Sequence, residues 1–338
     1  MDRSVNPLVS VLLPFYRAGD ELDVAIGSIV DQAFSDWELL LIDNNADEIA
    51  RRIAAQRVAS DPRIRLLQEP RQGIAFALNR GLEMARGELI ARMDADDVSD
   101  PRRLARQVAF LHENPGAGAV ATQSTFRPAL PRNTGYRLFV QWQNAILSAE
   151  EHAVSRFIES PLAHPTICFR KSLVDRFGPY DTGRVPEDYE LWLRWMDHGV
   201  RIYKIPEPLL QWNDHPGRLS RNHENYSREA FYRVKCRYLA RWIQRELPQH
   251  KKIIVCGGGK TGRKRAALLT EAGVDVYGFT DVKSRPNRAH RFLPIGGLKS
   301  PEPWFLISFI SRRGVGSAIR QHFTALGFKE GRDFIIAG

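Results

Sequence analysis

The sequence predicts an α/β protein, with a parallel sheet covered by helices in its first part and a second, smaller α/β domain after it. Two observations predict this class. Short β-rich runs alternate with amphipathic segments over the first third of the chain. After Pro248, a strand, a glycine-rich turn and a helix begin a new unit. With 338 residues, 43% of them hydrophobic, the chain is long and apolar enough for two domains that each bury a core.

In the first part, each predicted strand is a short apolar run and each predicted helix has apolar residues at helical spacing. Such alternation favours parallel strands joined by helices. The last of these helices follows Ser99-Asp100-Pro101, a capping residue with proline in the first turn. The predicted strands are 8–13, 38–43, 63–67, 88–93 and 117–122, and the predicted helices are 21–33, 47–60, 74–86 and 102–114.

Residues 124–165 interrupt this rhythm with Pro128, Pro131 and Pro161 and a stretch that contains Trp142, so we interpret them as an insertion or an acceptor-side segment. The pattern then resumes and leads into a second unit. From residue 166 on, the predicted strands are 166–170, 201–205 (ending before Pro206 and Pro208), 252–256 and 275–279. The predicted helices over the same part of the chain are 171–177, 187–198, 228–246 and 263–272. We expect a first domain over 1–225, a basic linker helix over 226–250 and a second domain over 251–338.

Charge and cysteine usage restrict the kind of protein. The formal net charge is +10, and all of the excess lies in residues 251–338, which hold 16 basic and 6 acidic residues. Three widely spaced cysteines (Cys168, Cys236 and Cys256) do not suit a disulfide scaffold or a zinc cluster. No apolar run approaches the roughly 20 residues of a spanning helix, and the start of the chain lacks a signal-peptide pattern. We expect a cytoplasmic location.

Three carboxylates, Asp94, Asp96 and Asp97, directly follow the apolar run 88–93. In open α/β sheets, ligands bind beyond the carboxyl ends of the strands. Carboxylates this close repel one another, and a divalent cation is the simplest compensation. Such a cation can hold a diphosphate. The alternative is a solvated acidic loop or a helix N-terminus that favours negative charge.

Other polar and aromatic residues follow the first two predicted strands and should meet at the same edge of the sheet. Phe15 and Tyr16 end the first strand, and Asp43 and Asn44 end the second. Aromatic faces stack on nucleobases, and carboxylates or amides read a base edge by hydrogen bonds. The alternatives are that the aromatic residues belong to the core and that Asn44-Asn45 is a turn tolerating positive φ.

Seven segments, in order, resemble glycosyltransferase family 2, and the resemblance covers about the first 215 residues. It implies the GT-A fold, which binds nucleotide sugars. One departure is Asn44, where the family usually has an aspartate that contacts uracil. The segments are Val9 to Pro14, Gln32 to Glu38, Leu41 to Asn44, Gly73 to Gly81, Ala85 to Glu88, Asp94-Ala95-Asp96 and Pro186-Glu187-Asp188.

The resemblance implies a role for each matching position. It implies that Mn2+ or Mg2+ bridges the donor diphosphate at Asp96, with Asp97 in support, and that Asp188 is the base that activates the acceptor hydroxyl, with Glu187 as a second candidate. The two acids at 187 and 188 could instead simply favour a helix N-terminus. The implied nucleotide-binding residues are Pro14, Phe15, Tyr16, Asp43, Asn44, Arg71, Gly73, Asn79 and, at the ribose, Asp94.

Two histidines are candidates for further contacts. His215 resembles a histidine that some relatives place near the metal, and His164 is a candidate near the acceptor. A neutral imidazole is a reasonable ligand for a transition metal, although single histidines are more often hydrogen-bonded structural residues. We therefore name His215 as the candidate third metal ligand.

The segment from Arg228 to Arg245 is basic and has aromatic and aliphatic residues at helical spacing. It could lie on an anionic membrane surface, where lipid-linked acceptors reside. It could also be a linker helix whose apolar face packs on a domain. No nucleic-acid-binding module is recognisable, so we expect no nucleic-acid partner.

In the C-terminal unit, Gly257, Gly259 and Gly262 have the GxGxxG spacing between a predicted strand and helix, and Asp281 follows the next strand. Such a turn can hold a phosphate at a helix N-terminus, while the acid bonds a ribose. The unit resembles the Rossmann-like nucleotide-binding domains fused to sugar-modifying enzymes. The glycines could equally serve only tight packing of the strand on the helix.

Together these observations predict an inverting, metal-dependent glycosyltransferase. It would move a sugar from a nucleotide donor, most simply a UDP-sugar, to a glycan or lipid-linked acceptor in surface-polysaccharide synthesis. Two alternatives stay open. One is an NAD(P)-dependent oxidoreductase acting through the C-terminal glycine turn, and the other is a non-catalytic nucleotide-sugar-binding protein.

Overall fold

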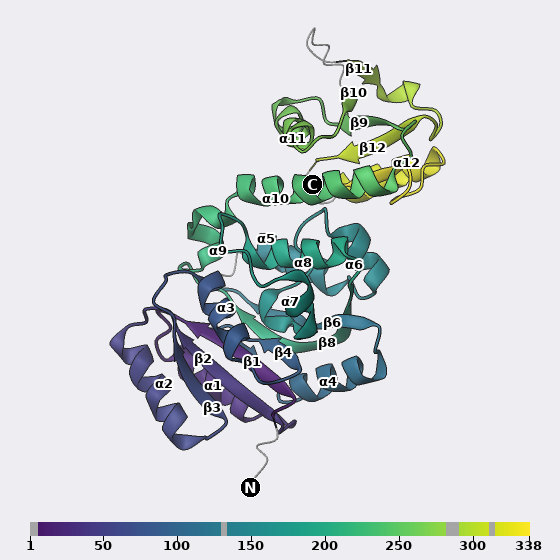
Figure 1. The fold of residues 1–338 in the computed structure, drawn as a ribbon. Coiled ribbons are helices and arrows are strands. Elements are labelled where there is room, and N and C mark those ends of the chain that lie inside the picture. Colours follow the sequence, from purple (N-terminus) through teal and green to yellow (C-terminus); the bar gives the residue numbers. More distant parts are fainter. Residues whose placement is uncertain (1–5, 130–133, 282–290, 311–314) are drawn as a thin grey trace. The chain divides into compact units, whose positions relative to one another are not determined.

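The computed structural model describes residues 6–129, 134–281, 291–310 and 315–338 (Figure 1). The chain divides into two compact units, and each is described by itself below. Unit 1 consists of Met1–His152 and Pro161–Tyr226, and unit 2 consists of Ala153–Ser160 and Ser227–Gly338.

Unit 1 is built around one mixed sheet of eight strands. Its order is β3-β2-β1-β4-β7-β6-β8-β5. The strands are β1 (Val9–Phe15), β2 (Trp37–Asp43), β3 (Ile64–Gln68), β4 (Leu89–Arg92), β5 (Val98–Ser99), β6 (Ala117–Arg127), β7 (Cys168–Arg170) and β8 (Arg201–Asn213).

The first four strands are parallel, so β1, β2 and β4 end at the same edge of the sheet. Beyond β4 the sheet becomes mixed, because β7 runs antiparallel to both β4 and β6. β8 then pairs with β6 in parallel and with the short β5 in antiparallel fashion. The predicted parallel sheet is therefore correct for the first four strands.

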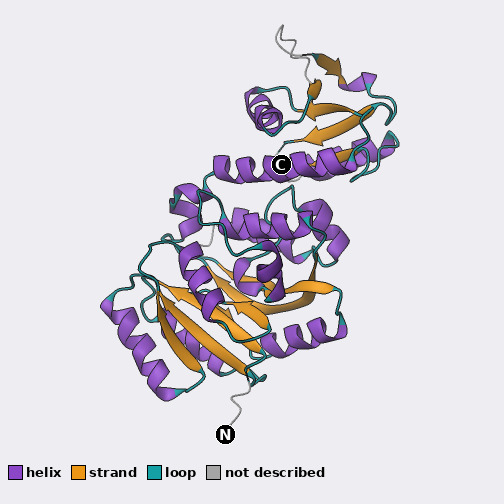
Figure 2. Cartoon of the chain, viewed as in Figure 1, coloured by secondary structure: helices purple, strands orange, loops and turns teal. Residues whose placement is uncertain are grey.

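Helices cover both faces of this sheet (Figure 2). The side chains of β1 alternate between two cores, with Val11 and Leu13 facing α1, α2 and α4, and Leu12 facing α3, α7 and α8. This alternation is the two-residue period of a strand that is buried on both faces. The helices of unit 1 are α1 (Glu21–Val30), α2 (Glu48–Ser60), α3 (Ile74–Met84), α4 (Arg103–Glu113), α5 (Thr134–Asn144), α6 (Ala149–Ser155, which runs into unit 2), α7 (Ser172–Phe177), α8 (Glu187–Asp197) and α9 (Leu219–Asn222), with short 3-10 turns at His164–Thr166 and Glu224–Tyr226.

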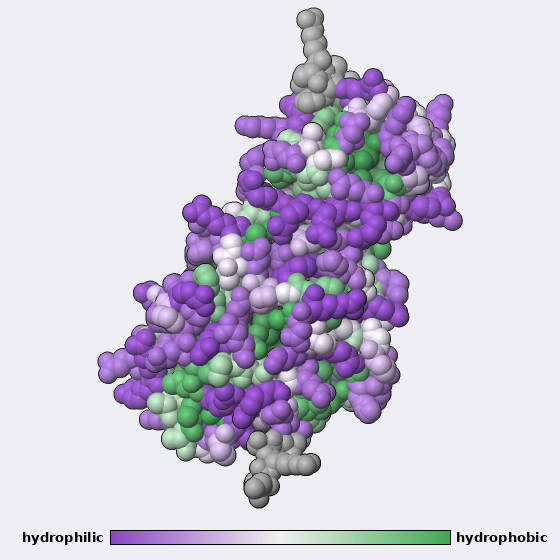
Figure 3. Space-filling view, in the orientation of Figure 1, coloured by the Kyte–Doolittle hydropathy of each residue, from purple (hydrophilic) through white to green (hydrophobic). Residues whose placement is uncertain are grey.

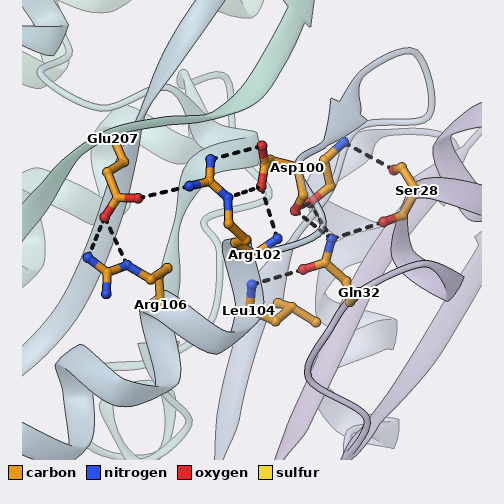
Figure 4. A network of polar contacts seen from close by, with 8 residues as sticks. Ser28, Gln32, Asp100, Arg102, Leu104, Arg106 and Glu207 are labelled. Carbon is orange, nitrogen blue, oxygen red and sulfur yellow. Dashed lines mark hydrogen bonds and ion pairs between the residues drawn. The ribbon is translucent and has the colours of Figure 1, made fainter.

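Gln32 joins the end of α1 to the start of α4 through a buried network (Figure 4). Its amide donates to the Asp100 carbonyl over 2.7 Å and to the Ser28 carbonyl over 2.9 Å. Its carbonyl accepts the Leu104 N–H over 2.9 Å. The network thereby fixes the chain just after the acidic loop 94–97.

The predicted strands and helices of the first third are confirmed, with ends that differ by a few residues. The expected strand end at 205 is wrong, because β8 continues through Pro206 and Pro208 to Asn213. Two local features admit these prolines: β5 pairs only with Leu210 and Gln211, and the register against β6 shifts near Pro208. A proline lacks an N–H to donate, so an unpaired side or a bulge is where a strand accepts one.

Unit 2 holds a five-stranded, wholly parallel sheet with the order β11-β10-β9-β12-β13. The predicted helix 228–246 and strand 252–256 are confirmed, whereas the helix expected from 263 begins at Lys260, with Gly259 as its N-cap. The elements are α10 (Arg228–Glu246), β9 (Lys252–Cys256), α11 (Lys260–Glu271), β10 (Val276–Asp281), β11 (Phe292–Pro294), a 3-10 turn (Ile295–Gly297), β12 (Trp304–Ser308), α12 (Val315–Ala325) and β13 (Phe334–Ile336).

All three cysteines are free and buried, which agrees with the expected absence of a disulfide scaffold. Within the described residues, none of the helices combines the length and the hydropathy needed to cross a bilayer.

Candidate active site

The three predicted carboxylates lie together just beyond the end of β4. Oxygen atoms of Asp94, Asp96 and Asp97 all lie within 4.8 Å of one another. The edge that carries them also carries the ends of β1 and β2, as the parallel strand order requires. The structure thus assembles the cluster that the spacing predicts.

Asp97 is the most buried member of this cluster, at 1% exposure. Its Oδ1 accepts the main-chain N–H of Asn213 over 2.8 Å. Its Oδ2 is buried and has no hydrogen-bond partner among the described residues. Burial, with the nearby charges of Asp94 and Asp96, raises the pKa of the Asp97 carboxyl well above its usual range. A buried, unpartnered carboxylate oxygen fits a site that receives a cation.

Asp96 links the cluster to His215. The His215 ring nitrogen Nε2 lies 2.8 Å from Asp96 Oδ2, and the Asn213 side-chain amide donates to the Asp96 carbonyl over 2.6 Å. Burial raises the pKa of the Asp96 carboxyl. The structure therefore brings His215 to the acids, whose carboxylates offer the oxygen ligands that Mg2+ or Mn2+ prefers, while the imidazole offers a nitrogen ligand for a transition metal.

Arg92 is a component of the site that the sequence analysis missed. Its side chain is buried at the end of β4 and forms an ion pair with Asp94 Oδ1. The buried Arg103 lies beside it and donates to the carbonyls of Arg92 and Pro165. The available signal was an arginine at the end of an otherwise apolar strand, since charged residues are seldom fully buried unless they are paired.

Glu187 and Asp188 form the first turn of α8. Burial raises the pKa of the Glu187 carboxyl to about 8 and that of Asp188 to about 6. The charge of Asp94 contributes to the raised pKa of Asp188, while that of Arg92 opposes it. The two acidic groups, 94–97 and 187–188, therefore lie within electrostatic reach of each other around Arg92.

At the end of β2, Asp43 and Asn44 both make several internal hydrogen bonds. Asp43 Oδ1 accepts the Ala46 N–H over 2.7 Å, and Oδ2 accepts Arg51 Nε over 2.8 Å. The Asn44 amide donates to the carbonyls of Glu69 and Arg71, and its oxygen accepts the Gly73 N–H over 2.8 Å. Asn44 thus holds the loop 69–73, while its contact with a base stays a prediction. The alternative interpretation, a turn with positive φ at Asn44-Asn45, is confirmed for Asn45.

The other residues predicted at the nucleotide lie around this loop. Arg71 pairs with the buried Glu69 over 2.7 Å. Gly73 has a φ of 136°, which favours glycine, and caps α3. The Asn79 side chain exchanges two hydrogen bonds of 2.9 Å with the main chain of Tyr180, so it fixes the loop ahead of α8.

The two predicted aromatic residues at the end of β1 differ in how far their side chains are exposed. Phe15 is 2% exposed and belongs to the core, as the alternative interpretation held, whereas Tyr16 is 39% exposed. Pro14 lies within β1 and is partly exposed. Of these residues, Tyr16 therefore offers the most accessible aromatic surface.

In unit 2, the glycine turn combines tight packing with polar contacts. A Cβ placed on Gly262 would lie 1.8 Å from the Gly257 carbonyl oxygen, and Gly257 has a φ of 100°. The Gly258 N–H donates to Asp281 Oδ2 over 3.2 Å. The packing interpretation therefore accounts for Gly262, and a nucleotide at Gly257, Gly259, Gly262 and Asp281 stays a prediction.

The chain is similar to bacterial glycosyltransferases. EpsE of Bacillus subtilis, provisionally named a glycosyltransferase, is 33% identical over 231 residues, which cover 66% of this chain and 78% of EpsE. The O-antigen biosynthesis glycosyltransferase WbnJ of Escherichia coli is 28% identical over 221 residues, which cover 64% of this chain and 83% of WbnJ.

Among solved structures, S. aureus TarS in complex with UDP-GlcNAc aligns with a TM-score of 0.56 and 16% identity, covering 78% of this chain and 71% of TarS. This likeness concerns the fold alone. The family model Glycosyl transferase family 2 matches residues 10–178. The chain therefore belongs to glycosyltransferase family 2 and is a glycosyltransferase with the GT-A fold.

Proposed function

We propose that the enzyme is an inverting, metal-dependent glycosyltransferase that uses a UDP-sugar. The observation that carries this proposal is the proximity of two kinds of acid: a cluster with an unpartnered buried oxygen at Asp97 and a separate carboxylate at Asp188. A cation held by Asp96, Asp97 and His215 would neutralise the negative charge that develops on the departing nucleoside diphosphate.

The proposed step is a single displacement. Asp188 Oδ2 takes the proton of the acceptor hydroxyl while the hydroxyl oxygen bonds to the anomeric carbon of the sugar. The bond from that carbon to the diphosphate breaks, and its electron pair leaves with the nucleoside diphosphate. Because attack and departure occur on opposite faces of the carbon, the configuration inverts.

Two kinds of likeness support the choice of substrates. TarS was solved with UDP-GlcNAc, and a mannosyltransferase from Pyrobaculum calidifontis was solved with GDP-Man and Mn2+. The names of WbnJ and of the Erwinia amylovora glycosyltransferase AmsE refer to O-antigen and amylovoran biosynthesis. We therefore propose a glycan or lipid-linked saccharide as the acceptor.

The test is the release of nucleoside diphosphate from UDP-GlcNAc, UDP-glucose, UDP-galactose and GDP-mannose, each with and without Mn2+. The proposal expects metal-dependent turnover of a UDP-sugar, and it expects Asp188→Asn to abolish turnover while donor binding persists. Turnover that survives both metal removal and Asp188→Asn would overturn it.

We also propose peripheral contact of unit 2 with anionic membranes through α10. Arg233, Arg237, Arg241 and Arg245 are exposed and spaced four residues apart, so they share one face of the helix. Figure 3 shows hydrophilic side chains along α10 in that view. Co-sedimentation with vesicles containing phosphatidylglycerol, compared with phosphatidylcholine alone, tests it. Equal binding to both would contradict the proposal.

A further inference from the structure

Glu187 precedes the proposed base, and one of its carboxylate oxygens is hydrogen bonded while the other faces a histidine ring beyond hydrogen-bonding distance. Tyr226 Oη donates to Oε2 over 2.6 Å. On the other side, His164 Nδ1 lies 3.8 Å from Oε1. Glu187 is 4% exposed. Glu187 is therefore enclosed, and its Oε2 is already occupied by the Tyr226 hydroxyl.

His164 is itself held from the far side. Its Nε2 lies 2.9 Å from the Tyr180 hydroxyl, and both rings are buried. The main chain of Tyr180 is fixed by the two hydrogen bonds of Asn79. Burial lowers the pKa of His164 well below its usual range, so the ring is neutral at neutral pH. A chain of contacts thus runs from α3 to the first turn of α8.

Tyr226 reaches Glu187 from a different direction. It ends the segment Asn213–Tyr226, whose first residue donates two hydrogen bonds to the acidic loop. His215, in the same segment, contacts Asp96. One stretch of chain therefore touches the acidic cluster at its start and the α8 acids at its end.

Asp188 has a different environment. Its Oδ1 accepts the main-chain N–H of Tyr189 over 2.6 Å. Among the described residues, no other side chain donates a hydrogen bond to this carboxylate, and the side chain is partly exposed. Of the two neighbouring acids, Asp188 is the more accessible to a substrate, because Glu187 is 4% exposed and Asp188 is partly exposed.

We propose that Glu187 is a positioning residue and not a base, and that Tyr226 and the chain Asn79–Tyr180–His164 hold it so that Asp188 presents Oδ2 to the acceptor hydroxyl. This inference rests on the proposed transfer reaction. It assigns a role to Tyr226, 39 residues from Glu187 in the sequence.

The first test separates positioning from base catalysis. Turnover of the donor selected from the panel above is measured for Glu187→Gln, Glu187→Ala and Asp188→Asn in the full chain. A glutamine carbonyl still accepts the Tyr226 hydroxyl but is no base. We expect Glu187→Gln to keep kcat within about tenfold and Asp188→Asn to lose at least about a hundredfold. Glu187→Gln as inactive as Asp188→Asn, with donor binding intact, would overturn the proposal.

The second test concerns Tyr226. Tyr226→Phe should lower kcat about tenfold with an unchanged donor KM, and this effect should disappear in the Glu187→Ala background, as expected of coupled residues. Tyr203→Phe is the matched control, because the Tyr203 ring packs on Phe110. A Tyr226→Phe enzyme identical to the wild type would contradict the assignment.

A measurement that does not depend on activity distinguishes the positioning role of Glu187 from the proposed transfer reaction. The free energy of unfolding of Tyr226→Phe, Glu187→Ala and the double variant should be non-additive if the two side chains interact. Additive values would overturn the positioning role even if transfer is confirmed. Turnover retained in Asp188→Asn would overturn the proposed reaction, while the unfolding cycle still reports on the contact.

Discussion

The main-chain N–H of Asn213 donates to Asp97 Oδ1 over 2.8 Å, joining the end of β8 to the acidic loop after β4. The bond orients a carboxylate that is otherwise enclosed, while Oδ2 stays unpartnered among the described residues. The last long strand of unit 1 thus sets the geometry of a site that begins more than a hundred residues earlier in the chain.

From this relationship we predict that Asp97→Asn impairs metal binding without unfolding the protein. The asparagine carbonyl can still accept the Asn213 N–H, but the charge is lost. The Kd for Mn2+ should rise about tenfold or more, since even outer-shell changes typically cost that much. Isothermal titration calorimetry measures it. Asp100→Asn is the control, because Asp100 lies nearby but pairs with Arg102, and equal affinity in both variants would contradict the prediction.

The raised pKa of Glu187 predicts a pH-dependent stability. Its pKa is about 8 in the folded protein against 4.5 ordinarily, so the folded state binds the proton more tightly. The protonated acid is tolerated below about pH 4.5, and ionisation costs stability progressively as the pH rises to 8. Glu187→Gln should therefore be more stable than the wild type at pH 8, by about 1 to 3 kcal/mol, and similar to it near pH 4.5.

Chemical denaturation at both pH values measures this difference. If the free energies of unfolding of Glu187→Gln and the wild type differed by the same amount at both pH values, ionisation of the Glu187 carboxyl would not destabilise the folded protein.

Asn44→Asp, which restores the residue usual in the family, should destabilise this protein. The Asn44 amide donates to two carbonyls, and a carboxylate would face both without a proton to share. We expect a loss of about 1 to 3 kcal/mol in the free energy of unfolding. Asn45→Asp, at an exposed neighbour, is the control and should cost less. Thermal unfolding compares them, and a neutral Asn44→Asp would show that the loop 69–73 does not depend on this amide.

Gly262→Ala should disrupt unit 2, because the new Cβ would lie 1.8 Å from a main-chain oxygen. The main chain must move to admit it, and we expect a loss of about 3 kcal/mol or more. Hydrogen exchange of the β9 and β10 amides measures the effect. Gly296→Ala, where a Cβ meets nothing within 4 Å, is the control. Equal protection in the two variants would argue against the packing role of Gly262.

The sequence predicted the features of unit 1 that are encoded locally. Alternating patterns located the first strands and helices, and the spacing of Asp94, Asp96 and Asp97 located the cluster, because parallel strands must end at one edge. Glu187 and Asp188 were found at the predicted helix start.

The features that the sequence did not predict depend on tertiary contacts. Arg92 acquires its role only when Asp94 and Arg103 surround it in the folded chain. Tyr226 bonds to Glu187 from 39 residues away in the sequence, and no local sequence pattern predicts this contact. Pro206 and Pro208 suggested a strand end because the neighbours that make them tolerable, β5 and β6, are distant in sequence.

The antiparallel pairing of β4 with β7 has a consequence for how substrate preference can diverge. The strand before the acidic loop and the strand that leads towards α8 share one ladder, whereas the polypeptide joining β6 to β7 loops away from it and carries α5 and α6. No residue of that excursion belongs to the β4–β7 ladder, and its last residues, His164 to Thr166, return the chain to the acids. Changes ahead of His164 therefore replace neither a residue of this ladder nor one of the acids at its end.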